Sequence, residues 1–319
     1  MRKTCRELTW HVVFFGAMMR CAGADAQQHG HGTIGQRPAG VEHDQRGYWF
    51  SHCGQDHTVH SLFASEASTV RTQQKRFFVD LAANHAFELS NTRALERDGN
   101  WDGICIDANP QLIDELRSNR RCTVIEAIVS STTGATLEFA VDGNDQGGRV
   151  VEKGGTHDFN VTQTTLRLED ALRKADAPRV IDYLSLDVEG HEESVLHNFN
   201  WRKWTFLAIT IEHPSSLIKR WLLKKGYHFV MQNCWYDDQL WLHSSFPGGL
   251  EAARARAVAS VRIWTAWFCA DVGPAHEPVH FREKRYVCGS QNRSQHYLHV
   301  LANATAQQAA DVAELASTS

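Results

Sequence analysis

From residue 77 onward, short apolar runs alternate with segments in which apolar residues recur every three or four positions. The first pattern is typical of buried strands and the second of amphipathic helices. It predicts strands at Phe77–Leu81, Gly103–Asp107, Cys122–Val129, Thr136–Val141, Thr162–Leu166, Ile181–Leu186 and Leu207–Glu212. It predicts helices at Glu88–Arg97, Pro110–Asn119, Leu168–Lys174, Glu192–His197 and Ser216–Lys225.

Two more strands, Tyr227–Gln232 and Gln239–His243, are expected to form a closing hairpin. Because strands alternate with helices, the sequence predicts an α/β fold with a mostly parallel sheet and right-handed crossovers. We place this domain at residues 49–246. A C-terminal extension follows at residues 247–319, with a helix candidate at Leu250–Ala259 and a polar end that we expect to be disordered.

The amino end has the layout of a secretory signal peptide. Arg2 and Lys3 precede the apolar run at residues 8–19, and small residues at 22–26 offer cleavage sites. We therefore predict a signal peptide at residues 1–26 and a polar linker at residues 27–48. Glycosylation sequons agree with a glycoprotein of the secretory pathway or the extracellular space, with a cytoplasmic protein as the alternative; they lie at Asn160, Asn292 and Asn303.

Composition narrows the classes of partner. A net charge of −4 over 319 residues gives no reason to expect nucleic acid, and the apolar runs are too short for a stable membrane span. The eight cysteines are scattered without a Cys-x-x-Cys pair, so we predict no metal site. Cys105 lies in an apolar strand and is expected to be a small core residue, while three others offer pairing partners if the protein is secreted: Cys234, Cys269 and Cys288.

Acidic residues stand at the predicted carboxyl ends of several strands. These are Asp80, Asp107, the pair Asp187 and Glu189, and Glu212, which is followed by His213. In open α/β sheets, ligands bind at the carboxyl ends of the strands. An acid after the second strand suits the two hydroxyls of a ribose, and two acids with a histidine suit general-base chemistry. Each taken singly also fits a structural role such as a helix N-cap, so it is their common order that points to a site.

At these positions the chain resembles the FkbM-type methyltransferases. The resemblance is carried by Phe78-Val79-Asp80-Leu81-Ala82-Ala83-Asn84, Gly103-Ile104-Cys105-Ile106-Asp107-Ala108-Asn109-Pro110, Asp182-Tyr183-Leu184-Ser185-Leu186-Asp187-Val188-Glu189-Gly190-His191-Glu192 and Ile209-Thr210-Ile211-Glu212-His213. An upstream Gly54-Gln55-Asp56 is similar to the lead-in of that family. Four linked motifs in order, within about residues 53–243, are more specific than a single glycine loop.

The resemblance implies a Rossmann-like class I methyltransferase sheet and an S-adenosylmethionine-dependent O-methyltransferase acting on a hydroxyl of a small molecule or glycan. It implies cofactor contacts at Asp80, Ala82, Asn84, Asp107 and Ala127. It places Asp187, Glu189, Glu212 and His213 on the methyl-transfer side, with the identity of the base left open between Asp187 and His213. Carboxylates near the sulfonium would favour the cationic cofactor.

The first loop departs from the family pattern, because Ala82 and Ala86 stand where glycines are expected. Glycine there permits positive φ and close approach of the backbone to a ligand. A Cβ in a left-handed conformation costs about 1–2 kcal/mol. Asn84, which tolerates such φ values, is retained. The expectation is a preserved fold with reduced cofactor affinity.

Two other classes of function stay open. The first is a non-catalytic secreted glycoprotein that keeps the fold as a binding module, which the two alanines favour. The second is a nicotinamide-dependent oxidoreductase, which fits Asp107 but lacks a Gly-x-Gly-x-x-Gly turn. Because S-adenosylmethionine is made in the cytosol, a lumenal methyltransferase would depend on imported cofactor.

Overall fold

The computed structural model describes residues 49–64, 75–98, 100–141, 148–151, 159–233, 238–272 and 291–317. The predicted signal peptide and linker lie outside these residues, and so do residues 142–147 and 152–158. The boundaries proposed for the domains therefore stay predictions.

The described chain is built on a seven-stranded sheet in the order β10-β11-β9-β8-β1-β2-β3. Its strands are β1 (Arg76–Leu81), β2 (Trp101–Asp107), β3 (Thr123–Glu126), β8 (Val180–Leu186), β9 (Thr205–Ile211), β10 (Tyr227–Gln232) and β11 (Gln239–His243). Neighbours from β3 through β9 are parallel, whereas β11 is antiparallel to both β9 and β10. The parallel-rich sheet and the closing hairpin predicted from the sequence are confirmed.

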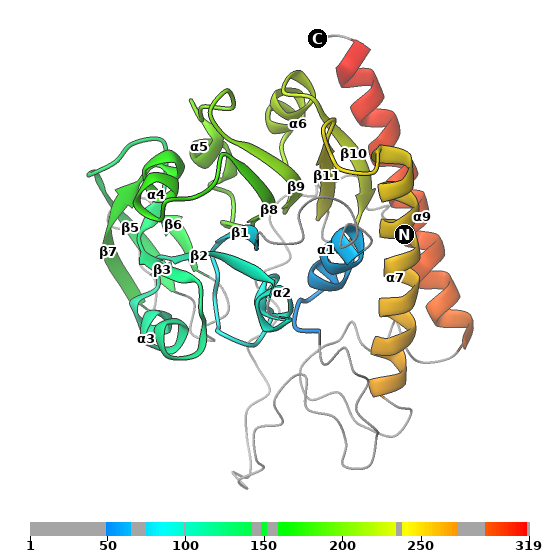
Figure 1. Ribbon diagram of the computed structural model, residues 1–319, viewed down its shortest axis with the longest axis horizontal. Coiled ribbons are helices and arrows are strands. Elements are labelled where there is room, and N and C mark those ends of the chain that lie inside the picture. Colours follow the sequence, from blue (N-terminus) through cyan, green and yellow to red (C-terminus); the bar gives the residue numbers. More distant parts are fainter. Residues whose placement is uncertain are drawn as a thin grey trace, which may run out of the picture. The chain divides into compact units, whose positions relative to one another are not determined.

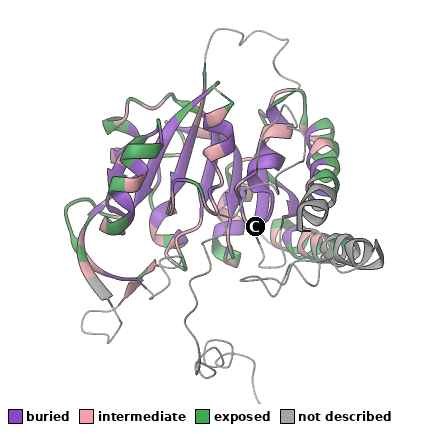
Figure 2. Ribbon diagram, turned by 90° about the horizontal axis from the view of Figure 1, so that it is seen from below, coloured by how far each residue is buried: buried purple, intermediate pink, exposed green. Residues whose placement is uncertain are grey.

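Helices cover both faces of this sheet (Figure 1). One face packs against α1 (Gln55–Ala64), α2 (Arg93–Arg97), α3 (Pro110–Asn119) and α7 (Leu250–Val272). The other face packs against α4 (Leu168–Lys174), α5 (Glu192–Leu196), α6 (Ser216–Lys224) and α9 (Gln291–Ser317). Figure 2 shows the strands buried between the two helix layers, as expected for a parallel sheet whose strands are apolar on both sides.

A second, four-stranded sheet has the order β4-β7-β5-β6. Its strands are β4 (Ile128–Val129), β5 (Thr136–Val141), β6 (Gly148–Val151) and β7 (Phe159–Leu166). It lies in the chain between β3 and α4, and a small apolar cluster joins it to the main sheet through Ala108 and Ile128.

The strand expected at Cys122–Val129 is broken in two. The backbone amide of Ala127 donates to the carbonyl of Asp107 at 3.0 Å, which ends the pairing with β2. The next two residues form β4 and pair with β7 of the second sheet. An apolar run cannot by itself reveal that its halves belong to two sheets.

The helix expected at Glu88–Arg97 is shorter than predicted, because α2 begins at Arg93. Leu89 has a φ of 57° and makes an isolated bridge with Ser51. The hydroxyl of Ser90 accepts from the amide of Arg93, the first residue of the helix, at 3.1 Å.

The C-terminal part differs most from expectation. A single helix, α7, spans Leu250–Val272, and residues 291–317 form α9 rather than a disordered tail. Val312 is buried in the sheet-covering core, and Gln308 accepts from Lys219 and Gln239. These contacts order a segment that looks only polar in sequence.

Cys105 of β2 is buried, as expected. It forms a disulfide with Cys122, the residue directly before β3, with a Cα–Cα distance of 5.8 Å. Cys234 and Cys288 lie outside the described residues. Within the described residues, no helix combines the length and apolar character that a membrane crossing requires.

Candidate functional site

The predicted site residues are brought together by strand register. Leu81 pairs with Ile106 and Leu186, and Leu186 pairs with Ile211. The residues one step further along these four strands therefore form a row at the carboxyl edge of the sheet. That row consists of Asp107, Ala82, Asp187 and Glu212.

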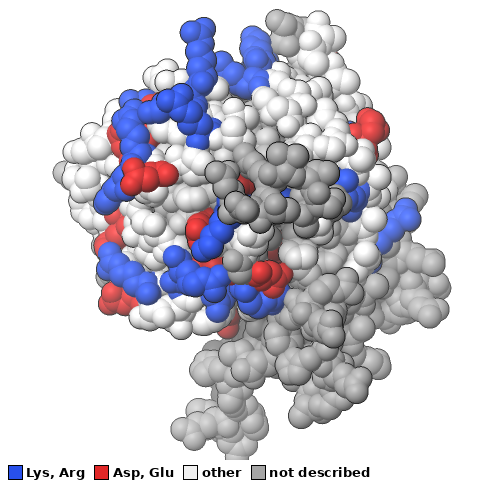
Figure 3. All heavy atoms as spheres, viewed as in Figure 1, with Lys and Arg blue, Asp and Glu red and all other residues white. Residues whose placement is uncertain are grey.

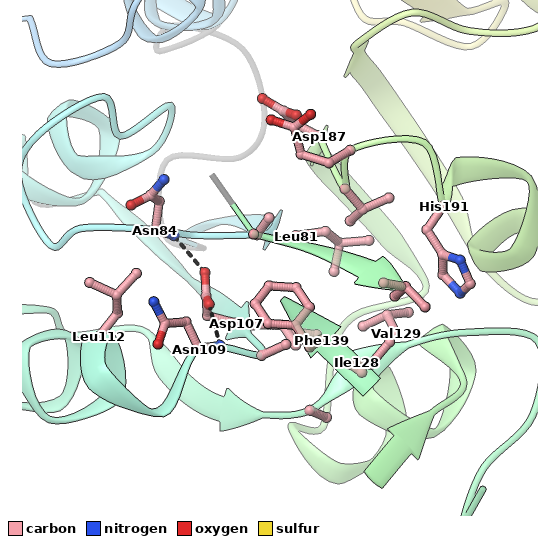
Figure 4. A pocket seen from close by; sticks show the side chains of 18 residues that line it. Leu81, Asn84, Asp107, Asn109, Leu112, Ile128, Val129, Phe139, Asp187 and His191 are labelled. Atoms are coloured by element: carbon pink, nitrogen blue, oxygen red, sulfur yellow. Dashed lines mark hydrogen bonds between the residues drawn. The ribbon is translucent and has the colours of Figure 1, made fainter. Parts of the chain in front are cut away.

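A pocket of about 760 Å³, including space open to solvent, lies along this edge. Of the predicted residues, it is lined by Ala82, Asn84, Asp107, Ala127, Asp187 and Glu189. The second sheet supplies a further wall (Figure 4). Six of the nine predicted residues therefore share one cavity.

Asp107 holds the loops around it by hydrogen bonds. Its two carboxylate oxygens each accept a backbone amide at 2.8 Å, from Asn84 and from Asn109 (Figure 4). Burial raises the pKa of Asp107, and these amide bonds oppose that rise. Because each carboxylate oxygen has two lone pairs, capacity for further hydroxyl donors remains.

The two alanines of the first loop differ from one another. Ala82 has a φ of 59°, lines the pocket and is exposed. Ala86 is fully buried in the core, has no positive φ and is not among the lining residues. Asn84 has a φ of 53°, in the left-handed region that asparagine tolerates. The expected backbone strain therefore applies to Ala82 alone.

This difference predicts opposite effects of glycine at the two positions. Ala82→Gly is expected to raise the free energy of unfolding by about 1 kcal/mol, because the left-handed penalty disappears. Ala86→Gly is expected to lower it by about 1 kcal/mol, because a buried methyl is lost and the unfolded chain gains freedom. Urea denaturation of both variants measures the effects, and a stabilising Ala86→Gly would contradict this interpretation.

The far end of the row is acidic. Side-chain oxygens of Asp187, Glu189 and Glu212 lie within 4.8 Å of one another. Burial, and then the charge of Glu212, raise the pKa of Asp187 well above its usual value. Burial also raises the pKa of Glu212 to about 7. Such clusters are common without a bound cation, so we assign no metal here.

These shifts predict a pH-dependent stability. For Glu212 the folded pKa lies above the unfolded value of 4.5, so the folded chain binds more protons between these values and stability falls as pH rises from about 4.5 to 7. Glu212→Gln keeps an oxygen acceptor but cannot ionise. We expect it to raise the free energy of unfolding at pH 8 by about 1–2 kcal/mol, with little effect at pH 4. Urea midpoints across this range test it, and equal gains at both pH values would refute it.

Gln55 and Asp238 extend this acidic end. The Gln55 amide donates to the Asp238 carboxylate at 2.7 Å, and the Asp238 charge contributes to the raised pKa of Glu212. Gln55 belongs to the upstream segment Gly54-Gln55-Asp56 of the family resemblance. Its contact with Asp238 places this segment beside the acidic end of the site.

Asp80 lies behind the first loop, outside the pocket lining. It is 2% exposed and accepts from the hydroxyl of Thr92 at 2.5 Å. Burial raises its pKa to about 6, against the opposing charge of the buried Arg120. In this position the carboxylate supports the loop, and a direct cofactor contact stays a prediction.

The two histidines at this edge have different surroundings. His213 has a φ of 42°, is exposed and does not line the pocket. His191 does line it (Figure 4). Its Nε2 lies 3.2 Å from the Ser130 hydroxyl. Burial lowers the pKa of His191, which favours the neutral form of the imidazole.

Several pocket residues were not singled out from the sequence. His191 belongs to one of the four motifs of the resemblance, but the sequence did not indicate that it lines the pocket. Asn109 had a signal as the residue before Pro110, and its side chain caps α3 by accepting from the amide of Gln111. Phe139, Gly148 and Val150 come from the second sheet, and nothing in the sequence indicated that this sheet would border the pocket.

The protein is thus a three-layer α/β protein with a polar crevice at the carboxyl ends of its parallel strands. Residues 80–229 match the model of the methyltransferase FkbM domain. This match confirms the resemblance that the four motifs predicted.

Solved structures include a weaker match, the "METTL16 MTase domain (crystal form 2)". Its TM-score is 0.34 with 13% sequence identity, over 58% of this chain and 64% of that chain. The chain thus spans less than two thirds of that structure, and at this level of similarity we transfer nothing from it. A comparison with curated proteins gave no significant match.

Proposed function

We propose that the domain is an S-adenosylmethionine-dependent O-methyltransferase with a class I sheet, acting on a hydroxyl of a small molecule or glycan. The strand order and the antiparallel β11 fit this fold. The single observation that carries the proposal is the convergence of Asp107, the Ala82–Asn84 loop and Asp187 with Glu189 in one pocket at the carboxyl edge.

The chemistry of the pocket fits the cofactor. Asp107 has the lone pairs to accept both ribose hydroxyls while it holds the loops at Asn84 and Asn109. The carboxylates of Asp187 and Glu189 favour a positive charge at the other end. When bound, S-adenosylmethionine supplies a methyl group already activated on a sulfonium.

The contribution of the chain is alignment and proton transfer. Holding an acceptor hydroxyl in line with the methyl group removes much of the entropic barrier. Three titratable groups line this end and are able to take the hydroxyl proton, namely Asp187, Glu189 and His191. His213, which the sequence favoured equally with Asp187, is a weaker candidate because it lies outside the lining.

One observation favours the alternative, a non-catalytic binding module. The left-handed conformation of Ala82 presents a methyl group at the pocket in place of a glycine hydrogen. A penalty of about 1.4 kcal/mol on the bound conformation is a tenfold loss of affinity.

Calorimetry with S-adenosylhomocysteine separates the two functions. Micromolar binding by the natural chain supports the methyltransferase, with Ala82→Gly expected to bind several-fold tighter. Binding by Ala82→Gly alone would support the binding module. The proposal would be overturned if neither the natural chain nor Ala82→Gly bound S-adenosylhomocysteine at millimolar concentration, with both shown to be folded by circular dichroism.

We propose a secretory or extracellular location. The Cys105–Cys122 disulfide supports it, because such bonds persist in oxidising compartments. On the face shown in Figure 3, basic side chains lie among acidic ones, which suits a small-molecule or glycan partner rather than nucleic acid. A mobility shift on glycosidase treatment after expression in mammalian cells would support secretion, and a fully reduced cytosolic product would exclude it.

A further inference from the structure

We propose that Phe139 of the second sheet, held against Gly148, forms the wall on which the adenine ring of the cofactor stacks. This inference rests on the proposed function and deepens it by assigning the nucleobase end of the pocket. It gives the second sheet a role in recognising the donor.

The polarity of the pocket orients its ligand. Asp187 and Glu189 make one end acidic, whereas the wall from the second sheet is apolar and contains Ile128, Phe139 and Val150. A sulfonium is favoured at the acidic end and an aromatic base at the apolar end. Asp107, the proposed ribose ligand, lines the same pocket (Figure 4).

The apolar end is contiguous with the proposed ribose site. Phe139 belongs to the same buried cluster as Ala108, the residue that follows Asp107 in the chain. A base attached to a ribose that Asp107 holds would therefore lie next to this cluster. The acceptor is placed at the other end, beside the carboxylates.

The ring of Phe139 is fixed by the absence of a side chain at Gly148. Phe139 pairs with Val150 and Val141 pairs with Gly148, so the ring reaches diagonally across the two strands. A Cβ on residue 148 would lie 2.3 Å from Cζ of Phe139. The ring would have to move, because real Cβ contacts are never that short.

An aromatic ring over a cross-strand glycine also occurs as a purely sheet-stabilising contact. That role alone does not require either residue to face a ligand. Here both Phe139 and Gly148 line the pocket, and Phe139 is 9% exposed. The two roles make different predictions for ligand binding.

The test measures binding of S-adenosylhomocysteine and of adenosine alone to the full chain by calorimetry. Phe139→Ala is expected to weaken both ligands by about tenfold, the usual effect of losing one base–aromatic stack. Phe139→Tyr keeps the ring and is expected to bind as the natural chain does. Leu137→Ala is the matched control, because Leu137 packs on the same cluster from the same strand but does not line the pocket.

A double-mutant cycle examines the coupling to Gly148. Gly148→Ala is expected to weaken adenosine binding in the natural chain, and to have no further effect in Phe139→Ala, since the ring it displaces is gone. Unchanged adenosine binding in Phe139→Ala, or equal losses in Phe139→Ala and Leu137→Ala, would overturn the inference while the natural chain still bound S-adenosylhomocysteine. Failure of the natural chain to bind that ligand would instead overturn the proposed function, and this inference with it.

Discussion

Asp107→Ala is expected to weaken S-adenosylhomocysteine binding by about 100-fold or more. Each charged hydrogen bond to a ribose hydroxyl contributes about 1.5–3 kcal/mol, and two such bonds are lost. The substitution also removes the acceptors of the amides of Asn84 and Asn109, so the loops lining the pocket lose their anchor. Calorimetry on the folded variant measures the change.

Asp102→Ala is the matched control for this experiment. Asp102 lies on the same strand, β2, but its side chain is 53% exposed and pairs with Lys75 at 2.8 Å. Exposed pairs of this kind contribute little, so its binding constant is expected to stay within about twofold. If Asp107→Ala bound as tightly as Asp102→Ala, the ribose assignment would be wrong.

Glu96→Ala is expected to lower the free energy of unfolding by about 3–5 kcal/mol. Glu96 and Arg120 form an ion pair at 2.7 Å with side chains that are 1% and 0% exposed. Glu96 also accepts from the backbone amides of Arg121 and Cys122. Its removal therefore leaves the buried charge of Arg120 without its carboxylate partner and two backbone amides without their acceptor, of which that of Cys122 is buried.

Urea denaturation measures this loss against Lys75→Ala, which breaks an exposed pair and is expected to cost about 0.5 kcal/mol or less. If Glu96→Ala fails to fold, Glu96→Gln keeps an acceptor oxygen and is expected to give a smaller but measurable loss. A cost below about 1 kcal/mol for Glu96→Gln and for Glu96→Ala would show that the network adds no more than a surface pair.

The network has a functional consequence because it lies beside the first loop. Arg120 donates to the hydroxyls of Ser90 and Thr92, and Thr92 donates to Asp80 at the end of β1. The carboxylate that the sequence assigned to the cofactor is thus tied to a buried arginine from beyond α3. Its position depends on a residue forty positions away in the chain.

The local sequence determined where several helices and strands begin and end. Asn109 followed by Pro110 predicted the start of α3, and the structure has Asn109 as its cap. The apolar runs ending in Asp107 and Asp187 predicted β2 and β8, because both faces of a parallel strand are buried. The four motifs were sufficient to predict the match of residues 80–229 to the model of the methyltransferase FkbM domain.

Tertiary structure decided which of those residues share a cavity. Strand register placed Asp107 and Asp187 at one edge of the sheet, whereas Asp80 is buried behind the first loop and His213 lies outside the pocket lining. Phe139 reaches the pocket from a separate sheet, and α9 is ordered by contacts with β10 and β11. Contacts between residues far apart in the chain leave no periodic trace in it, so the sequence determined the strands and their chemistry, and packing alone decided the composition of the site.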